Sequence, residues 1–111
     1  MILAIIGSRS LSIDNLNCYI SDNVTEIVTG GAKGIDSCAR EYALNHNMKL
    51  KEFLPDYNRY GKVAPLHRNL QIIAYSDAVI AFWDGNSRGT KFVIDSCKKN
   101  NKNITVIKMK Q

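Results

Sequence analysis

Short apolar runs alternate along this chain with stretches in which apolar side chains recur every three or four residues. The runs predict strands at residues 2–6, 26–29, 48–54, 77–83 and 104–109. The intervening stretches predict helices that begin near Ile13 (with Ser12 as its cap), Gly34, Pro65 and Thr90. Two parallel strands must be joined by a long connection, usually a helix, that carries the chain back to the start of the next strand. The alternation of strands and helices therefore favours a parallel sheet. We therefore predict an α/β fold, a Rossmann-like three-layer sandwich with helices on both faces of the sheet.

Length and cysteine usage limit what else the chain can be. The 111 residues suffice for one domain, residues 1–111, and leave little room for a second. No apolar run approaches the roughly 20 residues that span a bilayer, and the first run has no basic leader or cleavage site. The three cysteines are scattered and, with the two histidines, show no zinc-ligand spacing. We expect a cytoplasmic protein with buried free thiols, without a metal site or membrane contact.

The positive charge of the chain is concentrated near its C-terminal end. The formal net charge is +5, and residues 88–111 carry seven basic side chains against one acidic one, Asp95. Such a segment could attract nucleic acid or another anion. It could equally be a solvated lysine face that aids solubility.

Glycine, hydroxyl and basic residues follow the first two predicted strands. In parallel α/β sheets, ligands bind outside the carboxyl ends of the strands. The first loop offers the Ser8 hydroxyl and the Arg9 guanidinium, which can hold a phosphate in two hydrogen bonds. The second loop opens a helix, whose free N–H groups and dipole attract anions, and it contains Gly30, Gly31 and Gly34. It matches neither the dinucleotide fingerprint nor the Walker pattern.

A second glycine-containing loop with hydroxyl and basic residues follows the fourth predicted strand. Ser87, Arg88, Gly89 and Thr90 open another helix there, beside the first anion site. Each loop alone could be an ordinary turn, but two on adjacent strands favour a phosphate-bearing ligand. The polar and aromatic loop at residues 55–62 leads to two further candidates, and its tyrosines could stack on a base. The predicted ligand residues are Gly7, Ser8, Arg9, Gly30, Gly31, Lys33, Gly34, Asp36, Arg68, Asn69, Asp84, Ser87, Arg88, Gly89 and Thr90.

Four stretches of the sequence resemble the SLOG superfamily, which contains the DNA-processing protein DprA and the LOG nucleotide phosphoribohydrolases. They are IGSR at residues 6–9, VTGGAKGID at 28–36, HRN at 67–69 and DGNSRGT at 84–90. The chain looks most similar to the small stand-alone YspA-like branch. The resemblance implies a five-stranded parallel sheet in the order 3-2-1-4-5. It also implies a nucleotide or nucleotide-derived ligand at the loops after strands 1, 2 and 4, and self-association into a homo-oligomer.

One departure from the family pattern concerns catalysis. In LOG enzymes a glutamate that takes part in cleaving the N-glycosidic bond stands three residues after the Gly-Thr pair, where this chain has Val93. Valine cannot act as an acid, a base or a charge stabiliser, so LOG-type activity is doubtful. Asp36 and Asp84 are the remaining candidate catalytic carboxylates near the crevice. Asp36 could instead interact with its helix terminus or with a ligand hydroxyl.

Three functions are consistent with these features. The first is a binding module, a sensor or sequestering protein, for a nucleotide or nucleotide derivative. The second is a nucleotide-cleaving enzyme of the phosphoribohydrolase or N-glycosidase kind that uses Asp36 or Asp84. The third is a DprA-like binder of single-stranded nucleic acid. We favour the first, because two anion sites weigh more than a diffuse excess of lysine. No cofactor is implied apart from the nucleotide ligand.

Overall fold

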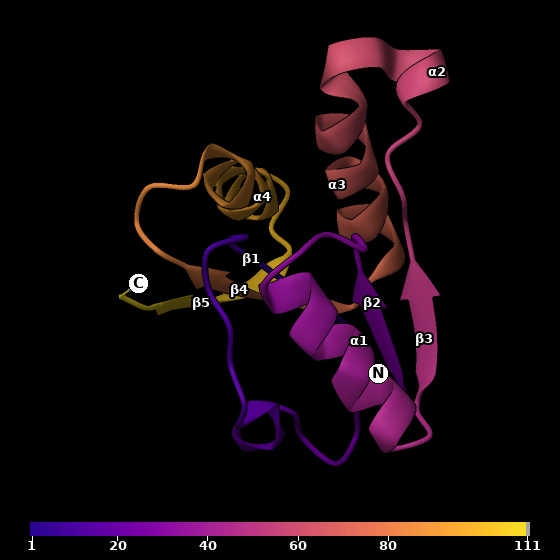
Figure 1. Cartoon of the computed structure of the whole chain (residues 1–111), viewed down its shortest axis with the longest axis vertical. Coiled ribbons are helices and arrows are strands. Elements are labelled where there is room, and N and C mark those ends of the chain that lie inside the picture. Colours follow the sequence, from indigo (N-terminus) through magenta and orange to yellow (C-terminus); the bar gives the residue numbers. More distant parts are fainter. Residues whose placement is uncertain (111) are drawn as a thin grey trace.

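The computed structural model describes residues 1–110 and contains one parallel sheet (Figure 1). The strand order is β3-β2-β1-β4-β5, so the predicted sheet and its order are confirmed. Because β1 lies between β2 and β4, the expectation that the two glycine-containing loops follow adjacent strands is wrong. In register, Leu3 of β1 lies opposite Ile27 of β2 and Ala78 of β4. The strands are β1 (Ile2–Gly7), β2 (Glu26–Thr29), β3 (Lys49–Glu52), β4 (Ala78–Trp83) and β5 (Asn103–Lys108).

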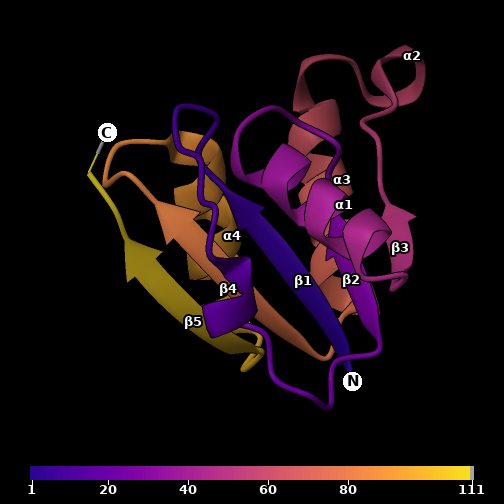
Figure 2. The same ribbon diagram turned by 60° about the horizontal axis from the view of Figure 1, so that its bottom comes forward.

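Helices cover both faces of the sheet (Figure 2). One face carries α1 (Ile35–Asn45) and the short 3-10 helix η1 (Leu16–Cys18). The other carries α3 (Ala64–Tyr75) and α4 (Arg88–Lys99). Alternate residues of β1 enter the two cores, which explains why this strand is apolar throughout. The remaining elements, α2 (Tyr57–Tyr60) and η2 (Gly61–Val63), precede α3.

The helix predicted to begin near Ile13 is absent, and this prediction is wrong. Only η1 forms in that segment, and its N-cap residue, Asn15, makes no side-chain capping bond. Asp and Asn side chains compete for backbone hydrogen bonds, and β-branched residues lose side-chain freedom in a helix. The apolar residues still pack on the face that α1 covers, with Leu11 and Leu16 in the core. Burial therefore holds this segment in place without a helix.

The third helix forms, but only part of its predicted buried face is buried. Pro65 lies in its first turn, as predicted. The spacing of apolar residues predicts that Leu66, Leu70 and Ile73 are buried; Ile73 is, but Leu66 and Leu70 are 37% and 45% exposed. Ile72 packs beside Ile73 against the sheet. The apolar residues of α3 lie on two sides of the helix, and spacing alone does not show which side the sheet covers.

Other local predictions are confirmed only in part. Of the three thiols predicted to be buried, only the Cys97 thiol is; that of Cys38 is half-buried and that of Cys18 is exposed. The predicted loop at residues 55–62 contains α2, which Asp56 caps by accepting a hydrogen bond from the Arg59 amide.

Among the helices of residues 1–110, none has the length and apolar content needed to cross a bilayer.

Candidate functional site

A crevice of about 460 Å³ lies at the carboxyl ends of β1 and β2, between the first turns of α1 and α4 and the start of α3. Ten of the fifteen predicted ligand residues line it, so residues far apart in the sequence converge on one cavity. These ten are Gly7, Arg9, Gly30, Gly31, Asp36, Arg68, Asn69, Ser87, Gly89 and Thr90.

The other five predicted ligand residues lie outside this lining. Lys33 and Arg88 are exposed to solvent away from it. Ser8 is 1% exposed, and its hydroxyl accepts the Asp84 amide at 3.2 Å. Gly34 is pressed against the backbone of the loop after β1. Ser8, Gly34 and Asp84 therefore shape the loops around the crevice and do not line it.

The loop between β4 and α4 is held by its own side chains. Asp84 Oδ1 accepts the amides of Asn86 and Ser87 at 2.8 Å each. Ser87 Oγ accepts the Thr90 amide at 3.4 Å as the cap of α4, and Trp83 Nε1 donates to the Ser87 carbonyl at 3.0 Å. These bonds fix the first turn of α4 against the crevice.

Arg68 and Asp36 form the polar centre of the crevice. Arg68 Nε donates to Asn69 Oδ1 at 2.8 Å, and Nη1 donates to the carbonyls of Gly30 and Phe53. A Cβ on Gly30 would stand 2.5 Å from Arg68 Nη1 and 3.0 Å from Asp36 Oδ2. The missing side chain of Gly30 therefore makes room for these two groups, and not for a ligand as the sequence suggests.

Burial perturbs both ionisable groups at this centre. Burial raises the pKa of Asp36, although the Ala32 amide and the nearby Arg68 charge oppose the rise. Burial lowers the pKa of Arg68, and the charge of Arg9 lowers it further against the attraction of Asp36. Asp36 Oδ1 is buried and meets no donor with good hydrogen-bond geometry, although the Thr29 hydroxyl and the Gly30 amide are close enough to favour the ionised carboxylate and so lower the pKa of Asp36. Burial of these two ionisable groups therefore costs folding free energy, which is a common property of functional sites.

We expect Asp36→Asn to raise the free energy of unfolding at neutral pH. Because the folded pKa of Asp36 is raised, folding favours the protonated carboxyl, and this group destabilises the fold as the pH rises through its folded pKa. An amide avoids that cost and can still accept the Ala32 amide, now at 3.1 Å from Asp36 Oδ2. Urea denaturation should show the gain at neutral pH and its loss below the ordinary pKa of 3.8. Asp36→Ala, which removes the acceptor, is the control; an equal gain in both would contradict this account.

Sequence reasoning missed the apolar part of the crevice. Pro55, Pro65 and Leu66 line it beside Tyr57, which is 57% exposed. Tyr60, the other candidate for base stacking, packs instead on the ring of His67, with centroids 3.7 Å apart. Pro55 and Pro65 could have indicated this part of the crevice from the sequence, because proline restricts the backbone on either side of Tyr57.

Val93 lines the crevice and is 2% exposed. The side chain at this position, which the sequence resemblance compares with the LOG glutamate, is therefore apolar and faces the cavity. Within residues 1–110, no three His, Cys, Asp or Glu side chains gather to hold a metal ion.

Two of the C-terminal lysines are engaged within the fold. Lys91 Nζ pairs with Asp95 at 2.9 Å, and Lys102 Nζ donates to the Ser76 carbonyl at 2.6 Å. The aliphatic end of Lys108 lies beside Gly85, where a Cβ would meet its Cε at 3.1 Å. Part of the predicted basic face thus serves the packing around β5 and the loop before α4.

Comparison with protein-family models, with curated proteins and with solved structures yields no match.

Proposed function

We propose that the chain binds a nucleotide or a nucleotide-derived, phosphate-bearing small molecule in the crevice, and acts as a sensor or sequestering module. The observation that carries this proposal is the convergence of Arg9, Arg68 and the first turns of α1 and α4 on one cavity. Arg9 forms no ion pair within residues 1–110, and it faces a second positive charge at Arg68. Helix N-termini and arginines together attract a phosphate.

The two parts of the crevice suit the two ends of a nucleotide. A phosphate fits near Arg9 and Gly89, where a guanidinium and the positive end of the α4 dipole are available, although the Thr90 amide is already donated to Ser87 Oγ. A base fits against Tyr57 and Leu66, because an aromatic face and apolar side chains favour stacking. A volume of about 460 Å³ lies within the range of small-molecule sites.

We expect Arg9→Ala to weaken nucleotide binding by about tenfold to a hundredfold, since a hydrogen bond to a charged group contributes about 1.5–3 kcal/mol. Native mass spectrometry with a panel of mononucleotides, nicotinamide nucleotides and cyclic dinucleotides would identify the adduct and the subunit count. Titration of both proteins with that ligand would measure the loss.

The matched control for this prediction is Arg40→Ala. Arg40 carries the same charge on α1, away from the crevice, and pairs with Glu52 at 3.7 Å. Equal weakening in both variants would mean that only the overall charge matters. Unchanged affinity in Arg9→Ala would show that the phosphate does not bind at this end of the crevice.

A nucleotide-cleaving enzyme is the second candidate, and Asp36 is the observation that favours it. Of the two carboxylates named from the sequence, Asp84 accepts hydrogen bonds from its own loop, whereas Asp36 lines the crevice with a raised pKa. A carboxyl with a raised pKa suits a general acid. Release of free base or ribose phosphate, abolished in Asp36→Asn, would support this activity.

We propose further that the protein self-associates and resides in the cytoplasm. Val63, Leu66 and Leu70 leave apolar surface exposed, at 56%, 37% and 45% exposure, and Leu66 also lines the crevice. All three cysteines are free, as is common in a reducing compartment. The subunit count from native mass spectrometry tests the first of these proposals.

A further inference from the structure

The edge of the sheet formed by β5 is open. Within residues 1–110 no strand lies beyond β5, and Figures 1 and 2 both show it as the outermost strand on its side. The Met109 amide donates to the Trp83 carbonyl of β4 at 2.8 Å. Backbone groups alternate in direction along a strand, so the N–H and C=O groups of Ile104, Val106 and Lys108 point away from β4. These outward groups have no hydrogen-bond partner in the described chain, and such a row can pair with another strand.

The two edges of the sheet differ in how well they are protected. At the opposite edge, β3 has four residues, of which three are charged, and its Glu52 pairs with Arg40. Short, charged edge strands resist pairing with another chain. β5 has six residues, and those at 104–107 (ITVI) are apolar or β-branched without interruption. Val106 is 37% exposed, so β5 retains the properties of a strand that another strand can join.

Positive charge lies at both ends of β5. Residues 96–111 contain five lysines and no acidic residue. They are Lys98, Lys99 and Lys102 before the strand, and Lys108 and Lys110 at its end. Lys102 donates to the Ser76 carbonyl, but the other four form no ion pair within residues 1–110. The segment therefore attracts negative charge from outside it.

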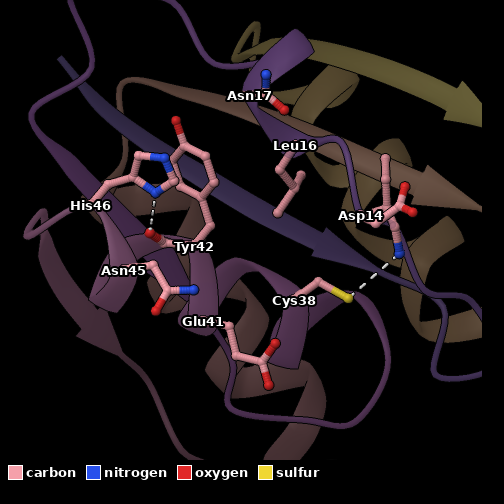
Figure 3. A pocket seen from close by; sticks show the side chains of 9 residues that line it. Asp14, Leu16, Asn17, Cys38, Glu41, Tyr42, Asn45 and His46 are labelled. Carbon is pink, nitrogen blue, oxygen red and sulfur yellow. Dashed lines mark hydrogen bonds between the residues drawn. The ribbon is translucent and has the colours of Figure 1, made fainter.

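A second copy of this chain is poorly suited to the β5 edge. The strand edges that it offers are β3 and β5, and both carry lysines, so pairing would bring like charges together. Its acidic side chains do not form an extended strand. Asp14 and Glu41, for example, come from a loop and from α1 and lie apart beside the pocket shown in Figure 3. The charge at β5 is thus complementary to a different, acidic partner.

We propose that β5 is a docking edge for an extended acidic segment of a protein partner, which joins the sheet as a sixth strand. Backbone pairing with Ile104, Val106 and Lys108 supplies affinity, and acidic side chains at both ends of the segment meet the lysines. The outward carbonyls of β5 need N–H donors, which a peptide backbone has and a phosphodiester backbone lacks. No residue of β5 lines the nucleotide crevice, so either proposal can fail without the other.

Amide hydrogen exchange, followed by NMR, tests the docking edge with three peptides. The first is an acetylated and amidated octapeptide of sequence EETVTVEE. The second is the same peptide with its four central amides N-methylated, and the third has lysine in place of glutamate. At ten times its Kd the first peptide should slow exchange of the Ile104, Val106 and Lys108 amides by about tenfold. Neither of the other two peptides should protect these amides.

Val106→Pro and Val106→Thr separate backbone pairing from side-chain contact. The Val106 amide is not used within the sheet, so proline leaves the bonds to β4 in place and removes one outward donor. Binding of the acidic peptide should be lost in Val106→Pro and retained in Val106→Thr. A second pair of variants tests the charge. Lys110→Glu should weaken binding about two- to fivefold, as loss of an exposed ion pair does, whereas Lys62→Glu, in η2, should not.

Four results would each overturn the proposal. The acidic peptide gives no protection, including the case in which a thymidine octanucleotide protects the same amides instead. The N-methylated or the lysine peptide binds equally well. The outward amides of the free protein become protected as its concentration rises, which would mean that a second copy covers β5. Lys110→Glu and Lys62→Glu behave alike.

Discussion

Gly89→Glu should make the protein more stable and at the same time abolish nucleotide binding. Gly89 lies in the first turn of α4 with an ordinary φ, and a Cβ built on it meets nothing within 4 Å. Replacing a helical glycine gains about 0.5–1 kcal/mol, and an acidic residue near a helix N-terminus adds about 0.3–1 kcal/mol. The open space beside Gly89 is the crevice. A carboxylate there would face the ligand phosphate, and like charges in contact cost several kcal/mol, so affinity should fall by about a hundredfold or more.

Gly89→Gln separates the charge of the new side chain from its bulk. It gains the same helix propensity, so its free energy of unfolding should also rise, but it should retain measurable affinity. Thermal unfolding and ligand titration of the three proteins provide both readouts, and Trp83, bonded to the loop before α4, is an intrinsic fluorescent reporter. Wild-type affinity in Gly89→Glu would show that no anion binds at this turn.

Sequence reasoning could place the loops, because strand ends in a parallel sheet fix where side chains meet. It could not assign separate roles to the glycines in those loops. Gly30 makes room for Arg68, Gly34 packs on a neighbouring loop, and only Gly89 opens onto the crevice without contact. The sequence shows where a glycine leaves space for want of a side chain. It does not show which atoms fill that space, because they come from distant parts of the chain.

The errors in the fold have a similar origin. Helical spacing fits residues 13–20 and two faces of α3, yet local spacing does not show which residues the sheet will cover. Asn69 is 9% exposed and accepts a hydrogen bond from Arg68 Nε, whereas Leu66 on the same helix is 37% exposed. Asp36 was identified from its place at a helix start, but Thr29 and Arg68, which oppose the rise of its pKa, are brought to it only by the folded chain.

Gly34→Ala should lower the free energy of unfolding by about 2–6 kcal/mol. Gly34 has φ 76° and ψ −123°, a conformation that costs a residue with a side chain about 1–3 kcal/mol. Its Cβ would also stand 2.6 Å from the Arg9 carbonyl oxygen and 2.7 Å from that of Ser8. These are backbone atoms, so relief requires the loop after β1 to move, and overpacking of this kind adds about 1–3 kcal/mol.

Gly61→Ala is the matched control, because Gly61 has nearly the same conformation (φ 58°, ψ −134°) but nothing within 4 Å of its Cβ position. Urea denaturation of both variants should show a cost for Gly61→Ala from the backbone alone and a larger one for Gly34→Ala. The difference measures the contact between the loops after β1 and β2. If that contact holds Arg9 at the crevice, Gly34→Ala should also weaken nucleotide binding as Arg9→Ala does. An equal loss of unfolding free energy in the two variants would mean that the Ser8–Arg9 loop moves aside without resistance. In that case the ligand, and not Gly34, positions Arg9.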